Sequence, residues 1–309
     1  MITALLVSIV LINLLFIVRF VVDFLKHREE TFAEKGSNLF YIVLGFITMI
    51  GATFGVSDYA INTVVYRKTG YIEDRLIPPT LNTECTIPLM FMALIYITAI
   101  QCDFLTLVVL ILAQTIGSVF SPRIVAKLPA STIRWAMGIG LAIAALFVFL
   151  GQISILPSDG TLTSLRGPRL LIAIGALFVY GALNNIGIGS YAPTMATIYA
   201  LGLSPRVAFP IMMGACTFSI AVGSSEFVRL QNYARKPTFW FAIFGTLGVF
   251  IAAYLIKDMN VYYIKWVVFV VIVFASFSLL SGELASLKVR SAHAESGVKR
   301  AGRAMERRR

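Results

Sequence analysis

The sequence predicts an all-α integral membrane protein with two inverted repeats. Each repeat consists of a broken re-entrant helical hairpin and three transmembrane helices, and one extra helix precedes the first repeat. Three observations lead to this fold class: an apolar composition, a motif that occurs twice, and an uneven distribution of basic residues. Of the 309 residues 58% are hydrophobic and 13% are charged, and the mean hydropathy is +0.85. Such values lie far outside the range of soluble globular domains and indicate a chain that resides in a bilayer.

A glycine- and hydroxyl-rich motif interrupts the apolar sequence at two places. A shift of 131 positions extends the match along much of the chain. One duplication therefore covers residues 39–151 and 170–282, and a repeat of this length in an apolar chain is typical of the two halves of a transporter. The motifs are Gly55-Val56-Ser57-Asp58-Tyr59-Ala60 and Gly187-Ile188-Gly189-Ser190-Tyr191-Ala192, and the matching residues include Pro79 and Pro210, Cys85 and Cys216, Gly117 and Gly248, and Trp135 and Trp266.

Apolar stretches without charged residues mark the membrane segments in order. A span needs about 20 apolar residues, and no signal-peptide cleavage site follows the first stretch, so we expect residues 1–25 to form a retained N-terminal helix. Repeat 1 has a hairpin at 39–68 and three spans, and repeat 2 has a hairpin at 170–202 and three spans. As one helix, residues 170–201 would be about 48 Å long against about 30 Å of hydrocarbon, so this segment must break. Residues 283–309 are expected to form a disordered, basic cytoplasmic tail.

The basic residues indicate how the two repeats are oriented. Hairpins that enter and leave on one side, followed by three spans, invert repeat 2 relative to repeat 1. With the tail inside, this arrangement places 21 of the 26 Lys and Arg residues on the cytoplasmic side, whereas interrupted segments that each crossed once would place 17 there. The positive-inside rule favours the inverted arrangement. We therefore expect a multi-pass protein of the bacterial inner (cytoplasmic) membrane, with its N-terminus outside and its C-terminus in the cytoplasm.

The two breaks place the N-termini of half-helices inside the membrane. The free N–H groups and positive dipole end of a helix N-terminus attract anions, and non-helical backbone at this depth must line protein or a water-filled cavity. Both tips should therefore meet near the midplane and bind a substrate. Other roles stay open, because Ser and Asn also cap helices and Thr also bonds the preceding turn. The candidate substrate-binding residues are Gly55, Ser57, Asp58, Asn62, Thr86, Asn185, Gly187, Gly189, Ser190, Thr194 and Thr217.

Two acidic residues in apolar segments are candidates for proton coupling. Carboxyls inside a membrane are costly, and they commonly mark ion or proton pathways. Asp58 lies at the first tip and Glu84 lies just before Cys85. The alternatives are a structural hydrogen bond at a half-helix N-terminus for Asp58 and a position at the cytoplasmic mouth for Glu84. Glu226 and Arg229, three residues apart, are expected to form a local ion pair.

The second motif, the Gly202-Leu203-Ser204-Pro205 segment and the small residues that follow resemble the TauE/SafE sulfite-exporter family, also called the four-toluene-sulfonate uptake permease family. The likeness covers about 240 residues across both repeats. The family typically shows a Gly-x-Gly-Gly-Gly run in each half, and here the run is eroded, with Asp58 in place of a glycine. The resemblance implies transport of sulfite, sulfonates or related small organosulfur or carboxylate anions.

Several other classes of function are disfavoured by the sequence. It contains no Gly-x4-Gly-Lys-Ser/Thr phosphate loop for ATP. Its two histidines, His27 and His293, lie at a helix end and in the tail, so neither an intramembrane His metal site nor a Ser-His triad is expected. The basic tail is typical of a juxtamembrane segment and not of nucleic-acid binding. The three cysteines lie in apolar segments, so we expect them to be buried hydrophobic residues and not to form a disulfide framework.

The expected function is that of a non-enzymatic secondary transporter. It would move small sulfur-containing anions, such as sulfite or sulfoacetate, by alternating access and without a cofactor or bound metal. An anion channel and a proton-coupled uptake carrier for carboxylates or sulfonates are the alternatives. The expected partners are the small anionic substrate and membrane lipid, and both a monomer and a homodimer stay open.

Overall fold

The computed structural model describes residues 2–120, 162–184, 190–257 and 269–284 except 279, together with scattered positions in 131–153 and 262–267. These residues are almost entirely helical, and within them the only extended pairing is an isolated bridge between Leu162 and Leu203. Four helices are long and apolar enough to cross a membrane: Ile2–Lys26, Asp74–Ala99, Arg206–Arg229 and Arg235–Leu255. The prediction of an all-α membrane protein is thereby confirmed at this level. The tail at 285–309 and most of the third span of repeat 1 lie outside the described residues.

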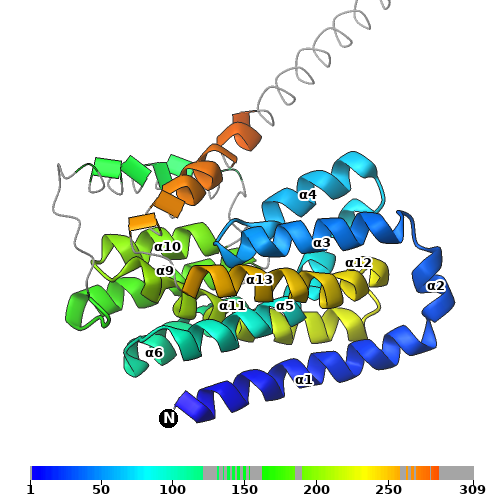
Figure 1. Cartoon of the computed structure of the whole chain (residues 1–309), viewed down its shortest axis with the longest axis horizontal. Helices are drawn as coiled ribbons and strands as arrows, with labels where there is room; N and C mark the ends of the chain where they lie inside the picture. The colour runs from blue at the N-terminus through cyan, green and yellow to red at the C-terminus, as the bar shows by residue number, and fades with distance from the viewer. Residues whose placement is uncertain are drawn as a thin grey trace, which may run out of the picture.

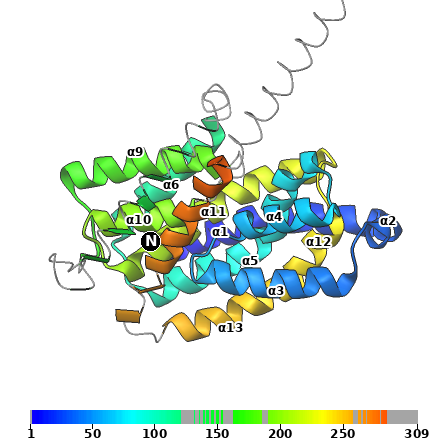
Figure 2. The same ribbon diagram turned by 90° about the horizontal axis from the view of Figure 1, so that it is seen from above.

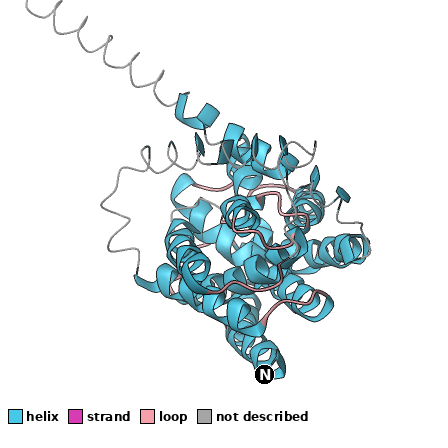
Figure 3. Cartoon of the chain, turned by 90° about the vertical axis from the view of Figure 1, so that its left-hand side faces the viewer, coloured by secondary structure: helices cyan, strands magenta, loops and turns pink. Residues whose placement is uncertain are grey.

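Most of the described helices lie side by side and run roughly along the long axis of the molecule (Figures 1 and 2). Seen along that axis, they form a bundle (Figure 3). Their bounds are α1 (Ile2–Lys26), α2 (Arg28–Ala33), α3 (Asn38–Thr53), α4 (Asp58–Thr69), η1 (Asp74–Leu76), α5 (Ile77–Ala99), α6 (Phe104–Phe120), α9 (Gly167–Asn184), α10 (Tyr191–Ala200), α11 (Pro205–Arg229), α12 (Arg235–Trp240), the π turn η2 (Phe241–Gly245) and α13 (Thr246–Lys257).

The predicted break between α3 and α4 has a defined local structure. Gly55 has a φ of +91°, which a residue with a side chain rarely adopts. The N–H groups of Val56 and Gly55 donate to the carbonyls of Gly51 and Ala52 at 2.9 Å each. These two bonds form a Schellman motif that ends α3. Ser57 then starts α4, because its hydroxyl accepts the N–H of Ala60 at 3.4 Å.

The second hairpin ends in the same kind of turn that ends α3. α9 ends at Asn184, residues 185–189 lie outside the described residues, and α10 begins at Tyr191. At the far end of α10, Gly202 has a φ of +89°, and the N–H groups of Gly202 and Leu203 donate to the carbonyls of Tyr199 and Ile198. Another Schellman motif therefore turns the chain into α11.

The two hairpins lie at opposite ends of the long axis, α3 and α4 at one end and α9 and α10 at the other (Figures 1 and 2). Their facing parts are in contact. A Cβ added to Gly55 in the first break would lie 2.8 Å from Sδ of Met195 on α10. The broken ends of both hairpins therefore reach the interior of the bundle.

α5 and α11 pack against each other in the interior, and most of their residues are buried. Around this pair, α6 packs against α9, and α13 packs against α3. Both outer contacts depend on glycine. A Cβ on Gly117 of α6 would lie 2.0 Å from the carbonyl oxygen of Phe178, and a Cβ on Gly248 of α13 would lie 2.6 Å from that of Phe46. Close backbone approach at small residues is the usual mode of helix association in membranes. α1 packs against α11.

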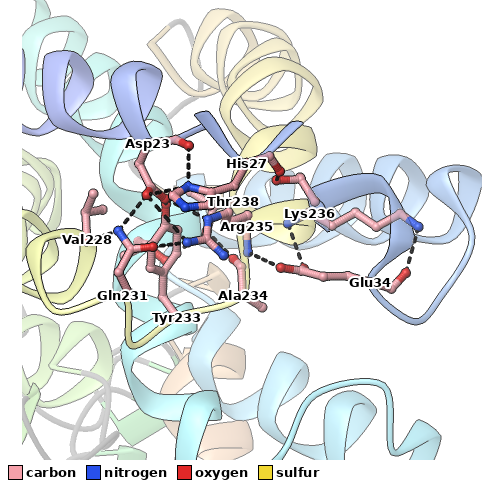
Figure 4. Close-up of polar contacts among 12 residues, drawn as sticks. Asp23, His27, Glu34, Val228, Gln231, Tyr233, Ala234, Arg235, Lys236 and Thr238 are labelled. Carbon is pink, nitrogen blue, oxygen red and sulfur yellow. Dashed lines mark hydrogen bonds and ion pairs between the residues drawn. The ribbon is translucent and has the colours of Figure 1, made fainter. Parts of the chain in front are cut away.

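A buried acid, Asp23, fixes the end of α1 to the loop after α11 (Figure 4). Its Oδ1 accepts Nε2 of Gln231 at 2.5 Å, and its Oδ2 accepts Tyr233 OH at 2.5 Å and Nε of Arg235 at 2.7 Å. Nδ1 of His27 lies 3.1 Å from Oδ1. A buried carboxylate is tolerated only when its lone pairs are satisfied in this way.

Glu34 and Lys236 tie the segment before α3 to α12 in the same region (Figure 4). The Glu34 carboxylate accepts the backbone N–H groups of Arg235 and Lys236 at 3.0 and 2.9 Å. In return, Nζ of Lys236 donates to the carbonyls of Phe32, Glu34 and Gly36. Burial raises the pKa of Glu34, while the two backbone N–H groups act in the opposite direction.

Asp103 and Arg166 form a comparable link at the opposite end, between the start of α6 and the segment before α9. Both carboxylate oxygens accept an Arg166 guanidinium nitrogen at 2.8 Å. Oδ2 also accepts the N–H and the hydroxyl of Thr106, at 2.9 and 2.8 Å. The hydrogen bond from Arg166 and the cap on α6 hold the pKa of Asp103 well below its usual range.

Candidate functional site

Asp58 occupies the first turn of α4, at the N-terminus that the break exposes. Its side chain is only 1% exposed, and its Oδ2 has no hydrogen-bond partner among the described residues. Asp58 is the first residue of α4, where the free backbone N–H groups and the positive dipole end of the helix favour a negative charge. Asp58 therefore has one structural role, at the helix N-terminus, and one oxygen that this role leaves free.

Glu84 lies two turns after the start of α5, and its side chain is buried within the bundle. It is 1% exposed. Oε1 accepts Nδ2 of Asn62 at 2.8 Å, and Oε2 accepts Tyr66 OH at 2.5 Å. Asn62 and Tyr66 lie one turn apart on α4, so one face of this half-helix holds the carboxyl of α5. The side chain of Glu84 is thus enclosed by α4, and its position at the cytoplasmic mouth stays an alternative.

The ion pairs of the described residues leave Asp58 and Glu84 without a basic partner. Those pairs involve Asp23, Glu73, Asp74, Asp103 and Glu226. The expected local pair of Glu226 with Arg229 is among them. Two carboxyls are thus buried on adjacent helices, α4 and α5, and neither is neutralised by a Lys, Arg or His side chain of the described chain.

Ser190 at the second tip differs from Ser57, because its side chain does not cap the helix that follows. Its hydroxyl lies 3.2 Å from Sγ of Cys216 on α11 and accepts Nε2 of Gln114 on α6 at 3.3 Å. The same Gln114 nitrogen lies 3.2 Å from the Cys216 sulfur. Asn184, at the end of α9, donates to this sulfur at 3.9 Å. Three helices and the tip therefore converge on one buried polar cluster.

Several polar atoms in this interior have no partner among the described residues. Thr194 lies one turn after Ser190 and is fully buried, and its hydroxyl is one such atom. The amide oxygens of Asn62 and Gln114 are two others. Buried polar groups are satisfied in the great majority of cases, so each exception calls for an explanation. Their concentration around the two tips is what a binding site for a polar solute requires.

The two threonines that follow the hairpins have different surroundings. Thr86 on α5 donates to the carbonyl of Asn82 at 2.7 Å, and its hydroxyl oxygen also lies 2.8 Å from that of Ser224 on α11. Thr217 on α11 accepts Nδ2 of Asn13 on α1 at 3.0 Å. Thr86 therefore makes the backbone bond of the preceding turn and also links α5 to α11.

The first break lies beside the second hairpin. A Cβ added to Gly55 would lie 2.8 Å from Sδ of Met195 on α10 and 3.9 Å from Cε of Met212 on α11. The expectation that the two tips share one binding site stays a prediction.

The structure brings together most of the predicted site residues and adds others. Ser57, Asp58, Asn62, Thr86, Ser190, Thr194 and Thr217 lie in or beside the polar interior, and Gly55 forms the first break. Asn185, Gly187 and Gly189 lie outside the described residues. Sequence reasoning missed Asn13, Tyr66, Asn82, Gln114 and Ser224. A polar side chain within an otherwise apolar helix is the signal that could have identified them.

Within the described parts of the chain, no three His, Cys, Asp or Glu side chains are grouped as a metal-binding cluster would require. The free cysteines Cys85 and Cys216 are buried and Cys102 is half-buried. The chain matched no protein-family model, no curated protein and no solved structure.

Proposed function

We propose that this protein is a secondary transporter for a small anion, which it carries across the bacterial cytoplasmic membrane by alternating access. The observation that carries the proposal is the convergence of two broken hairpins, from opposite ends of the bundle, on one buried polar interior. Discontinuous helices that meet near the midplane are the usual binding sites of transporters built from inverted repeats.

Support for inverted repeats comes from matched helix contacts. A shift of 131 positions takes Gly117 to Gly248, and a shift of 132 takes Phe46 to Phe178. The contact of Gly117 with Phe178 is therefore the counterpart of the contact of Gly248 with Phe46. In each case the helix after the central one in one half packs against the first hairpin helix of the other half. In this proposal the N-terminus lies outside and the basic tail lies in the cytoplasm.

Anion binding at the tips follows from the half-helix N-termini. The backbone N–H groups and positive dipole end of α4 and α10 point toward the breaks. Ser190 and Thr194 supply hydroxyl groups beside α10, and Asn62 supplies an amide beside α4. The sulfur-containing class of anion, sulfite or a sulfonate such as sulfoacetate, rests on the resemblance to the TauE/SafE family alone.

The direction of transport depends on coupling. The membrane potential contributes about 2.3 kcal/mol per charge at 100 mV, which opposes entry of an anion into an inside-negative cell. Export of a monovalent anion therefore needs no coupling ion, whereas uptake does. The buried carboxyls Asp58 and Glu84, which lack a basic partner among the described residues, favour a coupled uptake carrier over simple export.

Flux measurements in proteoliposomes test the proposal. Saturable counterflow of labelled sulfite or sulfoacetate is expected from a carrier, whereas unsaturated ohmic current would indicate an anion channel. Ser190→Leu and Asn62→Leu should abolish flux, because an apolar side chain replaces a polar group at each tip. Ser8→Leu is the matched control, since Ser8 lies on the exposed face of α1 and bonds only the preceding turn. Wild-type flux in both tip variants would remove the tips from the transport pathway.

A further inference from the structure

We propose that Asp58, Asn62 and Glu84 form a site for the coupling cation, and that this cation is sodium. The inference rests on the proposed transport function and names the ion that drives it. The three side chains come from two elements, the half-helix α4 and the central helix α5. All three are buried to 99% or more.

Oxygen atoms are the ligands of this site. Asp58 and Asn62 are four residues apart on α4, so they lie on the same face of the helix one turn apart. The Asn62 amide nitrogen is bonded to Oε1 of Glu84 at 2.8 Å, which places the amide oxygen of Asn62 beside that carboxyl. Oδ2 of Asp58 and Oδ1 of Asn62 both lack a partner among the described residues. Two carboxyls and one amide oxygen are thus gathered in a space that contains no basic side chain of the described chain.

The charge of the site requires a cation. Two ionised carboxyls in a membrane interior repel each other and are poorly solvated, so they must take up protons or bind a metal cation. Tyr66 and Asn62 donate to Glu84, and the N-terminus of α4 faces Asp58, so part of the negative charge is already stabilised. A single monovalent cation shared between the carboxyls would balance one of the two negative charges and leave the other to these donors.

The number of free oxygen atoms favours sodium over a single proton. A proton bound to one carboxyl oxygen makes that group a donor to one further acceptor, such as the Asn62 amide oxygen. A hard metal cation binds several oxygen atoms at once, including amide carbonyls as well as carboxylates. A metal ion can therefore contact Oδ1 of Asn62, Oδ2 of Asp58 and the Glu84 carboxyl together, which one proton cannot do.

The cation site lies beside the proposed anion site, so the binding of one ion should affect the binding of the other. Asp58 lies at the same α4 N-terminus that would hold the anion, and its negative charge opposes anion binding there. A sodium ion between Asp58 and Glu84 removes that repulsion, so each ion should increase the affinity for the other. The result is symport of sodium and the anion, which overcomes the opposing membrane potential.

Thermal unfolding of the purified full-length protein in detergent tests the site without any transport. At fixed pH and ionic strength, NaCl should raise the unfolding temperature in a saturable manner, whereas KCl and choline chloride should not, because an ion that binds only the native state stabilises it. Asp58→Asn and Glu84→Gln should weaken the apparent sodium affinity at least tenfold. Glu226→Gln is the matched control, since that acid is exposed and paired with Arg229, and it should respond as the wild type does.

The results separate the cation site from the transport function. Asn62→Ala keeps both carboxyls, so a tenfold loss of sodium affinity in this variant would support the role of the amide oxygen. The absence of a sodium-specific shift in the wild type would overturn the proposal, and so would an unchanged sodium affinity in the Asn62→Ala variant. In proteoliposomes, anion counterflow with no sodium response in detergent would refute the sodium site and leave the carrier intact. A sodium shift without flux of any anion would retain the site and refute the proposed transport.

Discussion

Gly181→Ala should loosen the contact between α6 and α9 and thereby disturb the candidate site. A Cβ on Gly181 would lie 2.0 Å from the carbonyl oxygen of Gln114 and 2.9 Å from the backbone nitrogen of Ser118. Real Cβ atoms essentially never approach such atoms within 3.0 Å. The obstacles are backbone atoms of a packed helix, so the two helices must move apart by about 1 Å or more to relieve the clash.

The expected cost follows from two opposing terms. Overpacking of this kind costs about 1–3 kcal/mol, and the higher helix propensity of alanine returns at most about 1 kcal/mol. With the full gain of about 1 kcal/mol subtracted, we expect a net destabilisation of up to about 2 kcal/mol. Because Gln114 also holds Ser190 and Cys216 through its side chain, displacement of α6 should reduce anion flux as well.

Gly175→Ala is the matched control on the same helix, since a Cβ at Gly175 would meet nothing within 4 Å. Thermal unfolding in detergent should show a lower midpoint for Gly181→Ala and an unchanged or higher midpoint for Gly175→Ala. Equal midpoints for the two variants would refute the close backbone approach of α6 and α9.

Three other outcomes follow from the contacts at the ends and in the interior. The raised pKa of Glu34 means that the native state keeps the Glu34 proton above the ordinary pKa of 4.5. The free energy of unfolding therefore falls as the pH rises from 4.5 through the native pKa. Glu34→Gln should flatten this pH dependence of the unfolding midpoint, and a profile identical to that of the wild type would contradict the burial of Glu34. The lowered pKa of Asp103 means that its pairing with Arg166 stabilises the native state above pH 3.8, and this stabilisation is lost as the pH falls further. Asp103→Asn should therefore have a lower unfolding midpoint than the wild type at pH 7 and a similar midpoint in acid. A difference between the two midpoints that does not change with pH would argue against the ion pair. Asn13→Ala removes the donor to Thr217 and should cost about 1 kcal/mol in unfolding experiments; a change within 0.2 kcal/mol would show that α1 contributes nothing through this bond.

The location of the helix breaks could be read from the sequence because glycine has a local effect. Gly55 was expected to interrupt the first hairpin, and its positive φ shows why a glycine is needed there. The role of Ser57 was left open between cap and ligand, and its bond to the Ala60 N–H supports the cap. Ser190, which corresponds to Asp58 under the 132-residue shift, stands at the N-cap of α10 but makes no capping bond. A repeated motif therefore predicts the backbone geometry better than the partners of each side chain.

The missed residues depend on tertiary packing and not on local pattern. Asn13 lies in α1, outside the duplicated segments, and becomes part of the interior only because α1 packs against α11. Gln114 has Gly245 as its counterpart under the 131-residue shift, so the repeat gave no indication of a polar partner for Ser190. Glu84 was singled out from the sequence, but its enclosure by Asn62 and Tyr66 could not be inferred from spacing along α5.

The central claim is that the two hairpins enter the membrane from opposite faces and share one site. Lys68 and Ala200 are equivalent under the 132-residue shift and are exposed near the ends of α4 and α10. We would introduce a single cysteine at each of these positions in a Cys102→Ser background, which leaves only the buried Cys85 and Cys216. A membrane-impermeant maleimide then reports the side of the membrane on which each introduced cysteine is accessible. In right-side-out vesicles the cysteine in the Ala200→Cys variant should react and that in Lys68→Cys should be protected, and inside-out vesicles should show the reverse. Reaction of both cysteines from the same face would contradict the account.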